Sequence, residues 1–129
     1  MAKQRVFISF DYDNDSDIKM LLAGQAKLTD SPFDFTDASV KEAMSGDWKA
    51  KVKRRLGNCD QMAVLCGAST HTASGVSAEL EIAQELGLPY FLLEGRSAKT
   101  CTKPKSARTT DKMYSWTWPN LKSLIGGGR

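Results

Sequence analysis

The sequence has few of the residues that cross-link small proteins or hold metal ions. Its 129 residues include three cysteines and one histidine. The cysteines are Cys59, Cys66 and Cys101, an odd number without any C-x-x-C pair, so the sequence predicts neither a disulfide framework nor a zinc site. We expect free thiols in a reducing compartment, and therefore a cytoplasmic protein.

Long apolar runs and nucleotide fingerprints are also missing. No segment approaches the ~20 apolar residues of a membrane-spanning helix, and the first apolar run is too short for the core of a signal peptide. The formal net charge of +3 is too small to indicate nucleic acid or a membrane as a partner. Neither a G-x-G-x-x-G nor a Walker pattern occurs, so no local motif predicts dinucleotide binding.

The sequence does contain a regular alternation of short apolar runs and helical patterns. An apolar content of 41% and a charged content of 26% are typical of a globular protein, and we expect a single domain, residues 1–129. Strands are expected at 5–10, 33–36, 62–66, 89–93 and 114–118. Because helices are expected between most of them, the sequence predicts an α/β fold with a doubly wound, flavodoxin-like parallel sheet in a three-layer α/β/α arrangement.

Capping residues and glycines predict where the helices begin and end. An acidic loop at 11–17 is expected before the first helix, with Asp15 or Ser16 as the N-cap. Asp47 is expected to cap the second helix, and Gly87 to end the third, which begins at about Val76. The apolar faces of the first two helices are expected at Ile18, Leu21, Leu22, Ala26 and Leu28, and at Trp48, Val52 and Leu56.

Polar residues gather at the carboxyl ends of the expected strands, where ligands bind in such folds. The acidic loop lacks the glycine and the terminal glutamate of an EF-hand, which favours a solvated cap region without a metal. Cys66 and His71 share one loop edge, but nothing positions a third catalytic group, so loop polarity is favoured over a nucleophilic pair. A basic helix face with Lys49 and Lys53 is interpreted as solvated, because no aromatic residues interleave with it.

One glutamate lies on the wrong side of the third helix. On a helical wheel with Val76 at zero, Glu79 falls at ~300°, inside the apolar arc. Glu81 and Glu85 fall at ~140° and ~180°, on the solvated face. A buried carboxylate is costly unless it is paired or reaches a polar cleft. Glu79, expected in the first turn, therefore either faces a ligand pocket or caps and pairs with a neighbouring group, and spacing alone leaves both open.

At this point the sequence resembles a known family, the TIR domains. The segment RVFISF at 5–10 resembles their first strand box, V-F-I-S-[FY], and GVSAEL at 75–80 resembles the pattern W-[CV]-x-x-E-[LI]. The glycine and proline of 87–89 sit at matching spacings. Asp47-Trp48, with Asp60 before the next strand, is similar to the TIR-like branch found in bacterial Thoeris anti-phage systems. The resemblance covers roughly residues 4–94.

The resemblance implies an enzyme that cleaves the bond between nicotinamide and ribose in NAD and makes a cyclic ADP-ribose isomer. NAD is then a substrate and no cofactor is expected. The family's catalytic glutamate falls on Glu79, and the substrate-binding candidates are Phe7, Ser9, Phe10, Asp11 and Asp37. The expected partners are NAD, a phage-derived trigger and a downstream NADase effector that responds to the product. A homo-oligomer is a further candidate.

The chain departs from the family at one position, and two other functions stay open. Gly75 stands where NADase members carry a tryptophan that packs beside the ligand. One alternative is a non-catalytic TIR-type module that works through TIR–TIR contacts. The other is a related N-glycosidic enzyme that acts on nucleosides, similar to a deoxyribosyltransferase.

Overall fold

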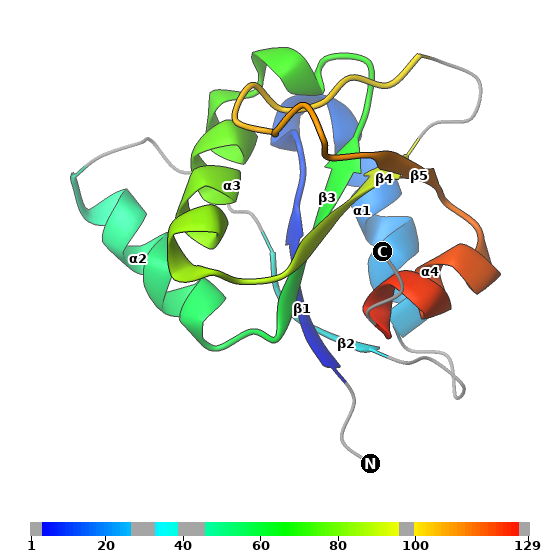
Figure 1. Ribbon diagram of the computed structural model, residues 1–129, viewed down its shortest axis with the longest axis horizontal. Coiled ribbons are helices and arrows are strands. Elements are labelled where there is room, and N and C mark those ends of the chain that lie inside the picture. The colour runs from blue at the N-terminus through cyan, green and yellow to red at the C-terminus, as the bar shows by residue number, and fades with distance from the viewer. Residues whose placement is uncertain (1–3, 27–32, 39–45, 96–99, 127–129) are drawn as a thin grey trace.

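The strands form one parallel sheet of five in the order β2-β1-β3-β4-β5. The protein is seen here as a computed structural model, which describes residues 4–26, 33–38, 46–95 and 100–126 (Figure 1). The strands are β1 (Gln4–Ser9), β2 (Phe33–Ala38), β3 (Gln61–Cys66), β4 (Tyr90–Glu94) and β5 (Met113–Ser115). This order confirms the predicted doubly wound, flavodoxin-like fold.

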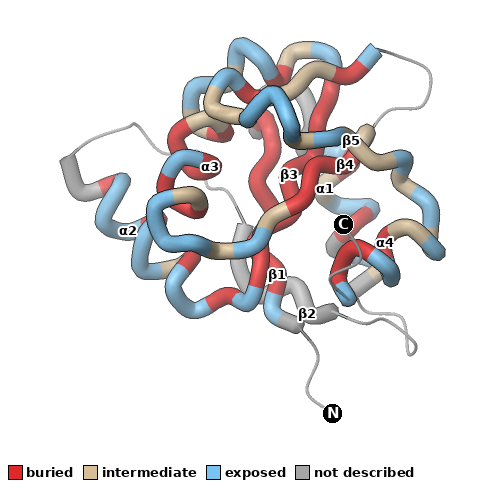
Figure 2. Tube along the Cα trace, viewed as in Figure 1, coloured by how far each residue is buried: buried red, intermediate tan, exposed pale blue. Residues whose placement is uncertain are grey.

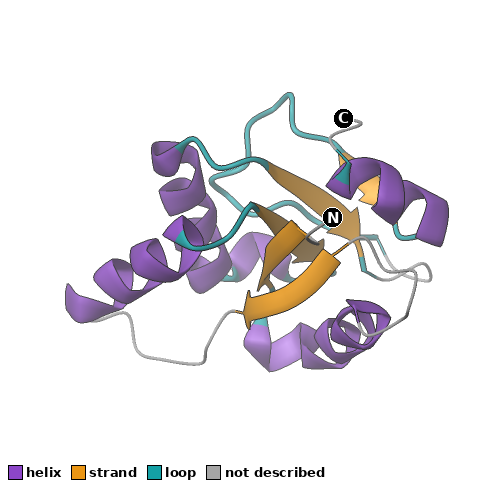
Figure 3. Ribbon diagram, turned by 90° about the horizontal axis from the view of Figure 1, so that it is seen from below, coloured by secondary structure: helices purple, strands orange, loops and turns teal. Residues whose placement is uncertain are grey.

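Helices cover both faces of the sheet (Figure 3). They are α1 (Tyr12–Ala26), α2 (Gly46–Gly57), the short 3-10 helix η1 (Thr70–Thr72), α3 (Ser74–Leu86) and α4 (Trp118–Ile125). One core cluster joins α2 and α3 to the sheet through residues such as Val52 and Leu80. A second cluster joins α1 and α4 to the opposite face through Leu22 and Leu121. The two clusters confirm the three-layer arrangement.

The central strands are buried on both faces, as Figure 2 shows. All six residues of β3 are buried, as expected for a strand with helices on either side. Along β1 the side chains alternate between the two clusters, so that Phe7 belongs to the cluster of α2 and α3, whereas Val6 and Ile8 belong to that of α1 and α4. Ser9 continues the series of Phe7 and faces α3.

The expected acidic loop was wrong, because α1 already begins at Tyr12. Asp13, Asp15 and Asp17 therefore lie inside the helix rather than before it. Ile18 and Leu22 are buried as expected. Leu21 is 63% exposed, which corrects its assignment to the buried face. Leu28 lies outside the described residues.

Strand β2 is longer than expected, and this moves Asp37. The strand runs to Ala38, so Asp37 lies within it instead of in a following loop. A register shift between Val6 and Phe7 lets β2 continue alongside β1, and Asp37 pairs with Phe7. Helix α2 begins at Gly46, so Asp47 is inside its first turn and not its N-cap.

Helix α3 begins two residues earlier than expected. Ser74 is its first residue, and η1 occupies the loop before it. The Thr70 hydroxyl accepts a hydrogen bond of 2.7 Å from the Gly67 N–H, which closes the turn after β3 and brings the chain early into the helix. Glu79 is consequently in the second turn rather than the first. The helix dipole acts less strongly there than at the N-terminus.

The C-terminal elements also shift by a few residues. Strand β5 ends at Ser115, where a longer strand was predicted. The reason is a helix cap: the Thr117 side chain accepts a hydrogen bond from the Asn120 N–H, and Pro119 follows in the first turn. Trp118 therefore opens α4, and the Lys122 ammonium lies 5.3 Å from the centre of its ring.

Gly87 ends α3 in a left-handed conformation, which gives a first prediction. Its φ is 68°, and an added Cβ would meet no atom within 4 Å. Gly87→Ala should therefore lower the unfolding free energy by about 1–2 kcal/mol, through backbone conformation alone. Gly57→Ala is the control, because that helix end is equally open and has no positive φ. Urea unfolding should show a loss for Gly87→Ala only, and equal midpoints would contradict this reading.

Candidate active site

The centre of the site is a buried pair formed by Ser9 and Glu79. The Ser9 hydroxyl donates a hydrogen bond of 2.7 Å to the Glu79 carboxylate, between residues 70 positions apart in the sequence. Ser9 is 0% exposed and Glu79 is 2% exposed. Strand β1 supplies the serine at its carboxyl end, and α3 supplies the glutamate from the face that packs on the sheet. Folding therefore confirms that Glu79 lies on the buried face.

This arrangement holds a carboxylate at a defined place next to the carboxyl edge of the sheet. Burial disfavours the ionised form, whereas a donated hydroxyl favours it, because the O–H dipole points at the negative charge. A charge-assisted hydrogen bond also fixes the orientation of the carboxyl group. A carboxylate has about four lone-pair sites and can accept hydrogen bonds from several donors at once. The pair can therefore orient an acceptor towards hydroxyl groups or a developing positive charge.

The other predicted site residues lie at different places around this pair. Phe7 shares the face of Ser9 and packs in the same cluster as α3. Asp11 follows Ser9 by two residues and is buried, with 8% of its surface exposed. Phe10 packs on the opposite face, in the cluster of α1, so the structure does not bring it to Glu79. Asp37 pairs through its backbone with Phe7, and nothing is described of its side chain. The substrate contacts assigned to these four residues stay predictions.

Position 75 is open in this chain. Gly75 lies one helical turn before Glu79, and residues four apart share a face of the helix. A Cβ at Gly75 would meet no atom within 4 Å. A small side chain at this position would therefore meet open space in the described part of the chain.

The Cys66–His71 pair is not formed. Cys66 is fully buried in β3, and its sulfur lies 3.9 Å from the Val64 carbonyl oxygen. His71 is exposed in η1 and, among the described residues, its backbone N–H and its Nδ1 hydrogen-bond Thr102, each at 3.0 Å. The histidine therefore holds a loop and does not activate the thiol. All three cysteines are buried thiols that form no disulfide within the described residues.

A long loop, residues 100–112, packs over the amino-terminal end of α3. Its Thr102 hydroxyl donates to the Gly67 carbonyl at 3.2 Å, and the Ser106 hydroxyl donates to the Ser77 carbonyl at 2.6 Å. The Ser106 N–H donates to the Ser77 hydroxyl at 3.0 Å. These bonds fasten a stretch in which the sequence predicted neither a helix nor a strand. No local pattern marks them, because each partner lies about 30 residues away.

The same loop is fastened at its far end by Tyr90, and this gives a pH prediction. The Tyr90 hydroxyl donates a hydrogen bond of 2.7 Å to an Asp111 carboxylate oxygen. Burial, followed by this hydrogen bond, raises the pKa of Tyr90 above 10.0. The unfolded chain then loses this proton at a lower pH than the folded one, so the unfolding free energy falls as pH rises above about 10. Tyr90→Phe should show a smaller loss between pH 9 and 11, and an unchanged slope would contradict the assignment.

The described residues contain no group of three or more histidine, cysteine, aspartate or glutamate side chains that could hold a metal ion. Within the same residues, Trp48 Nε1 is the buried side-chain atom that has no hydrogen-bond partner. Trp48 otherwise packs in the cluster of α2 and α3, as its helical spacing predicted. No helix in the described segments combines the length and the apolar character needed to cross a membrane.

The fold and the Ser9–Glu79 pair can now be compared with known proteins. The model of the family described as "Thoeris protein ThsB, TIR-like domain" matches residues 7–100, which is most of the chain. The match includes the last three residues of β1, all of α3 and both members of the buried pair. No curated protein matches the chain. On the strength of the family match, this chain belongs to the TIR-like domain family of the Thoeris protein ThsB.

Proposed function

We propose that this chain cleaves the nicotinamide–ribose bond of NAD and that Glu79 is its catalytic residue. The observation that carries the proposal is the buried hydrogen bond between Ser9 and Glu79 at the carboxyl end of β1. In doubly wound folds, ligands bind at this edge of the sheet. A carboxylate that is 2% exposed is costly unless it is paired or reaches a polar cleft, and the Ser9 hydroxyl supplies a partner that fixes its orientation. Membership in a Thoeris family is consistent with a role in anti-phage defence.

The reaction needs what a fixed carboxylate supplies. When the glycosidic bond breaks, its electron pair leaves with the nicotinamide nitrogen, and positive charge develops on the ribose. An ionised Glu79 that accepts hydrogen bonds from the ribose hydroxyls stabilises this charge, as carboxylates do in glycoside hydrolysis. Ser9 acts on the glutamate and is a positioning residue. Attack by water on the ribose carbon gives ADP-ribose.

The proposed product is a cyclic ADP-ribose isomer. The cyclic product forms when a hydroxyl or a base nitrogen of the same NAD molecule reaches the ribose carbon before water does. Where the attacking group is a hydroxyl, it also loses its proton. An enzyme achieves this by holding the ligand folded, which gives the internal nucleophile a high effective concentration. The product would then carry the signal to a downstream NADase effector, and a phage-derived component would trigger the reaction.

The decisive experiment compares infected cells that express the wild-type chain or Glu79→Gln. Mass spectrometry of lysates should detect nicotinamide and a cyclic ADP-ribose species after infection only when Glu79 is intact. Glu85→Gln, on the exposed face of the same helix, is the matched control and should behave as wild type. If phage resistance persists in Glu79→Gln without any product, the chain is an interaction module. If deoxynucleosides are cleaved and NAD is not, it is a nucleoside enzyme.

A further inference from the structure

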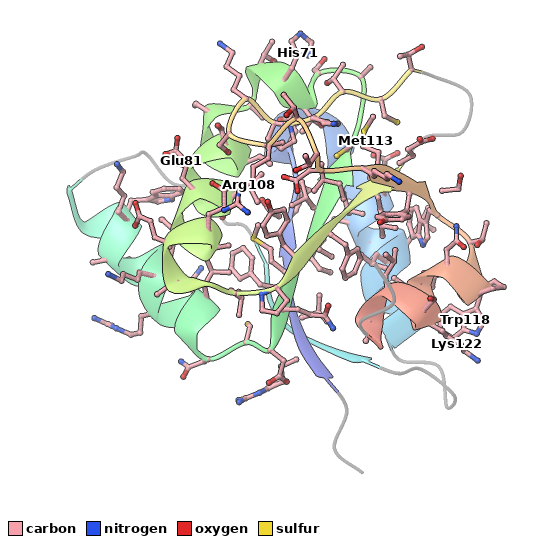
Figure 4. All side chains as sticks on the ribbon, viewed as in Figure 1. His71, Glu81, Arg108, Met113, Trp118 and Lys122 are labelled. Carbon is pink, nitrogen blue, oxygen red and sulfur yellow. The ribbon has the colours of Figure 1, made fainter. Side chains whose placement is uncertain are left out.

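A pocket lies on the outer side of α3. Its volume is about 280 Å³, and its lining includes Lys49 of α2, His71 of η1, Ser77 and Glu81 of α3, and Lys105 of the loop. Figure 4 shows His71 above the amino-terminal end of α3 and Glu81 on the side that faces α2. Ser77 and Glu81 fall at ~100° and ~140° on the helical wheel, far from Glu79 at ~300°. The pocket is therefore separate from the candidate active site.

The charges of the pocket favour an anion. Lys49 and Lys105 come from different segments and converge on it, and neither side chain forms a hydrogen bond or an ion pair within the described residues. Lys49 and Lys105 thus give the lining two positive charges, with which a bound phosphate can interact favourably. The lining also carries the hydroxyls of Ser74 and Ser77, which can donate to phosphate oxygens, whereas the Thr72 hydroxyl already donates to the Ser69 carbonyl at 2.7 Å.

Lys105 is held in place by the bonds that fasten the loop. Thr102 and Ser106 anchor the stretch on either side of Lys105, to Gly67 and to Ser77. A turn closed by the Ala107 N–H and the Pro104 carbonyl, 3.1 Å apart, includes Lys105 itself. The lysine backbone is thus fixed against α3, so that ligand binding has to order only the end of one side chain.

Glu81 narrows the class of ligand. It is the one carboxylate among the residues that line the pocket, and it would repel a bare phosphate. A ligand that also carries hydroxyl groups can donate hydrogen bonds to Glu81 while its phosphate lies between the lysines. We propose that this pocket binds a sugar phosphate or the phosphoribosyl part of a nucleotide, as a second site distinct from the site of Glu79.

The test is an NMR titration of the full chain with ribose 5-phosphate and with inorganic phosphate. We expect saturable amide shifts at His71, Ser74 to Ser77 and Lys105. The double variant Lys49→Gln/Lys105→Gln should raise the Kd for ribose 5-phosphate at least ~tenfold, as expected for the loss of charge-assisted contacts. Lys53→Gln is the matched control, because it also removes one positive charge from α2, but at a residue outside the pocket lining. It should change the Kd for ribose 5-phosphate less than ~twofold, which is the usual effect of an exposed charge.

A second variant tests the role of Glu81. Glu81→Gln should strengthen the binding of inorganic phosphate and reduce the preference for ribose 5-phosphate over phosphate. The proposal is overturned if the shifts do not saturate, if Lys53→Gln weakens binding as much as the double variant, or if the shifts centre on Ser9 and Glu79. An unchanged amide spectrum of the free double variant shows that the fold is intact. These outcomes are independent of NAD cleavage.

Discussion

Glu79→Gln is expected to lower the rate of NAD cleavage by about 10²–10³-fold or more, because the amide cannot stabilise positive charge on the ribose. The substitution keeps the size of the side chain and an oxygen that accepts the 2.7 Å hydrogen bond from Ser9, so the fold should persist. The rate is measured as nicotinamide release by the triggered protein. Because the lost interaction forms in the transition state, kcat should fall and KM should change little.

The matched control for this prediction is again an exposed glutamate of α3. Glu85→Gln makes the same chemical change on the solvated face and should leave kcat unaltered. Glu79→Asp is a second comparison, since it keeps the charge but withdraws it from the ribose by one methylene. It should fall between wild type and Glu79→Gln. Full activity of Glu79→Gln would remove Glu79 from the chemistry, whatever the behaviour of the aspartate variant.

Ser9→Ala is expected to lower the unfolding free energy by about 1–3 kcal/mol, because it removes a buried donor from a carboxylate. In a Glu79→Met background the same substitution should cost much less, since the hydroxyl has then lost its acceptor. The difference between these two costs is the coupling energy of the pair, and it should lie at about 0.5–3 kcal/mol. Urea unfolding of the four proteins in this cycle measures it.

An exposed position again supplies the control for the cycle. In a Glu85→Met background, Ser9→Ala should cost as much as in the wild-type protein, because Glu85 does not contact Ser9. Equal costs in all three backgrounds would mean that the hydrogen bond contributes nothing to stability. The cycle measures what the Ser9–Glu79 hydrogen bond contributes to stability, whereas the rate of Glu79→Gln measures what the carboxylate contributes to catalysis. Together they separate a carboxylate kept for catalysis from one kept for folding.

The fold could be predicted from the hydrophobic pattern of the sequence, because burial involves whole helices and strands. The run in β3 predicted a strand covered on both faces, and Trp48, Val52 and Leu56 predicted the buried face of α2. The errors of prediction lie at the ends of helices and strands, where single local contacts determine the boundary. Thr117 caps α4 and ends β5 early, and a register shift beside Val6 extends β2 past Asp37. Such local bonds leave only faint marks in sequence.

The candidate site could likewise be predicted only in part. Glu79 stood out because a charge on an apolar helix face conflicts with the periodicity of its neighbours. Its pairing with Ser9 could not be derived, since the bond joins residues 70 positions apart. Lys49 was interpreted as a solvated residue for the same reason, because Lys105, which lines the same pocket, lies far from it in the sequence. Only the docking of residues 100–112 on α3 brings them to one pocket.

The most direct test of the central claim is a crystal structure of Glu79→Gln with NAD. This variant should bind the substrate without consuming it, since the change affects the transition state more than the ground state. We predict that the ribose next to nicotinamide lies within hydrogen-bond distance of the residue 79 side chain, at the carboxyl end of β1. NAD bound elsewhere, or no NAD at concentrations that saturate the active wild-type protein, would contradict the assignment of Glu79 as the catalytic residue.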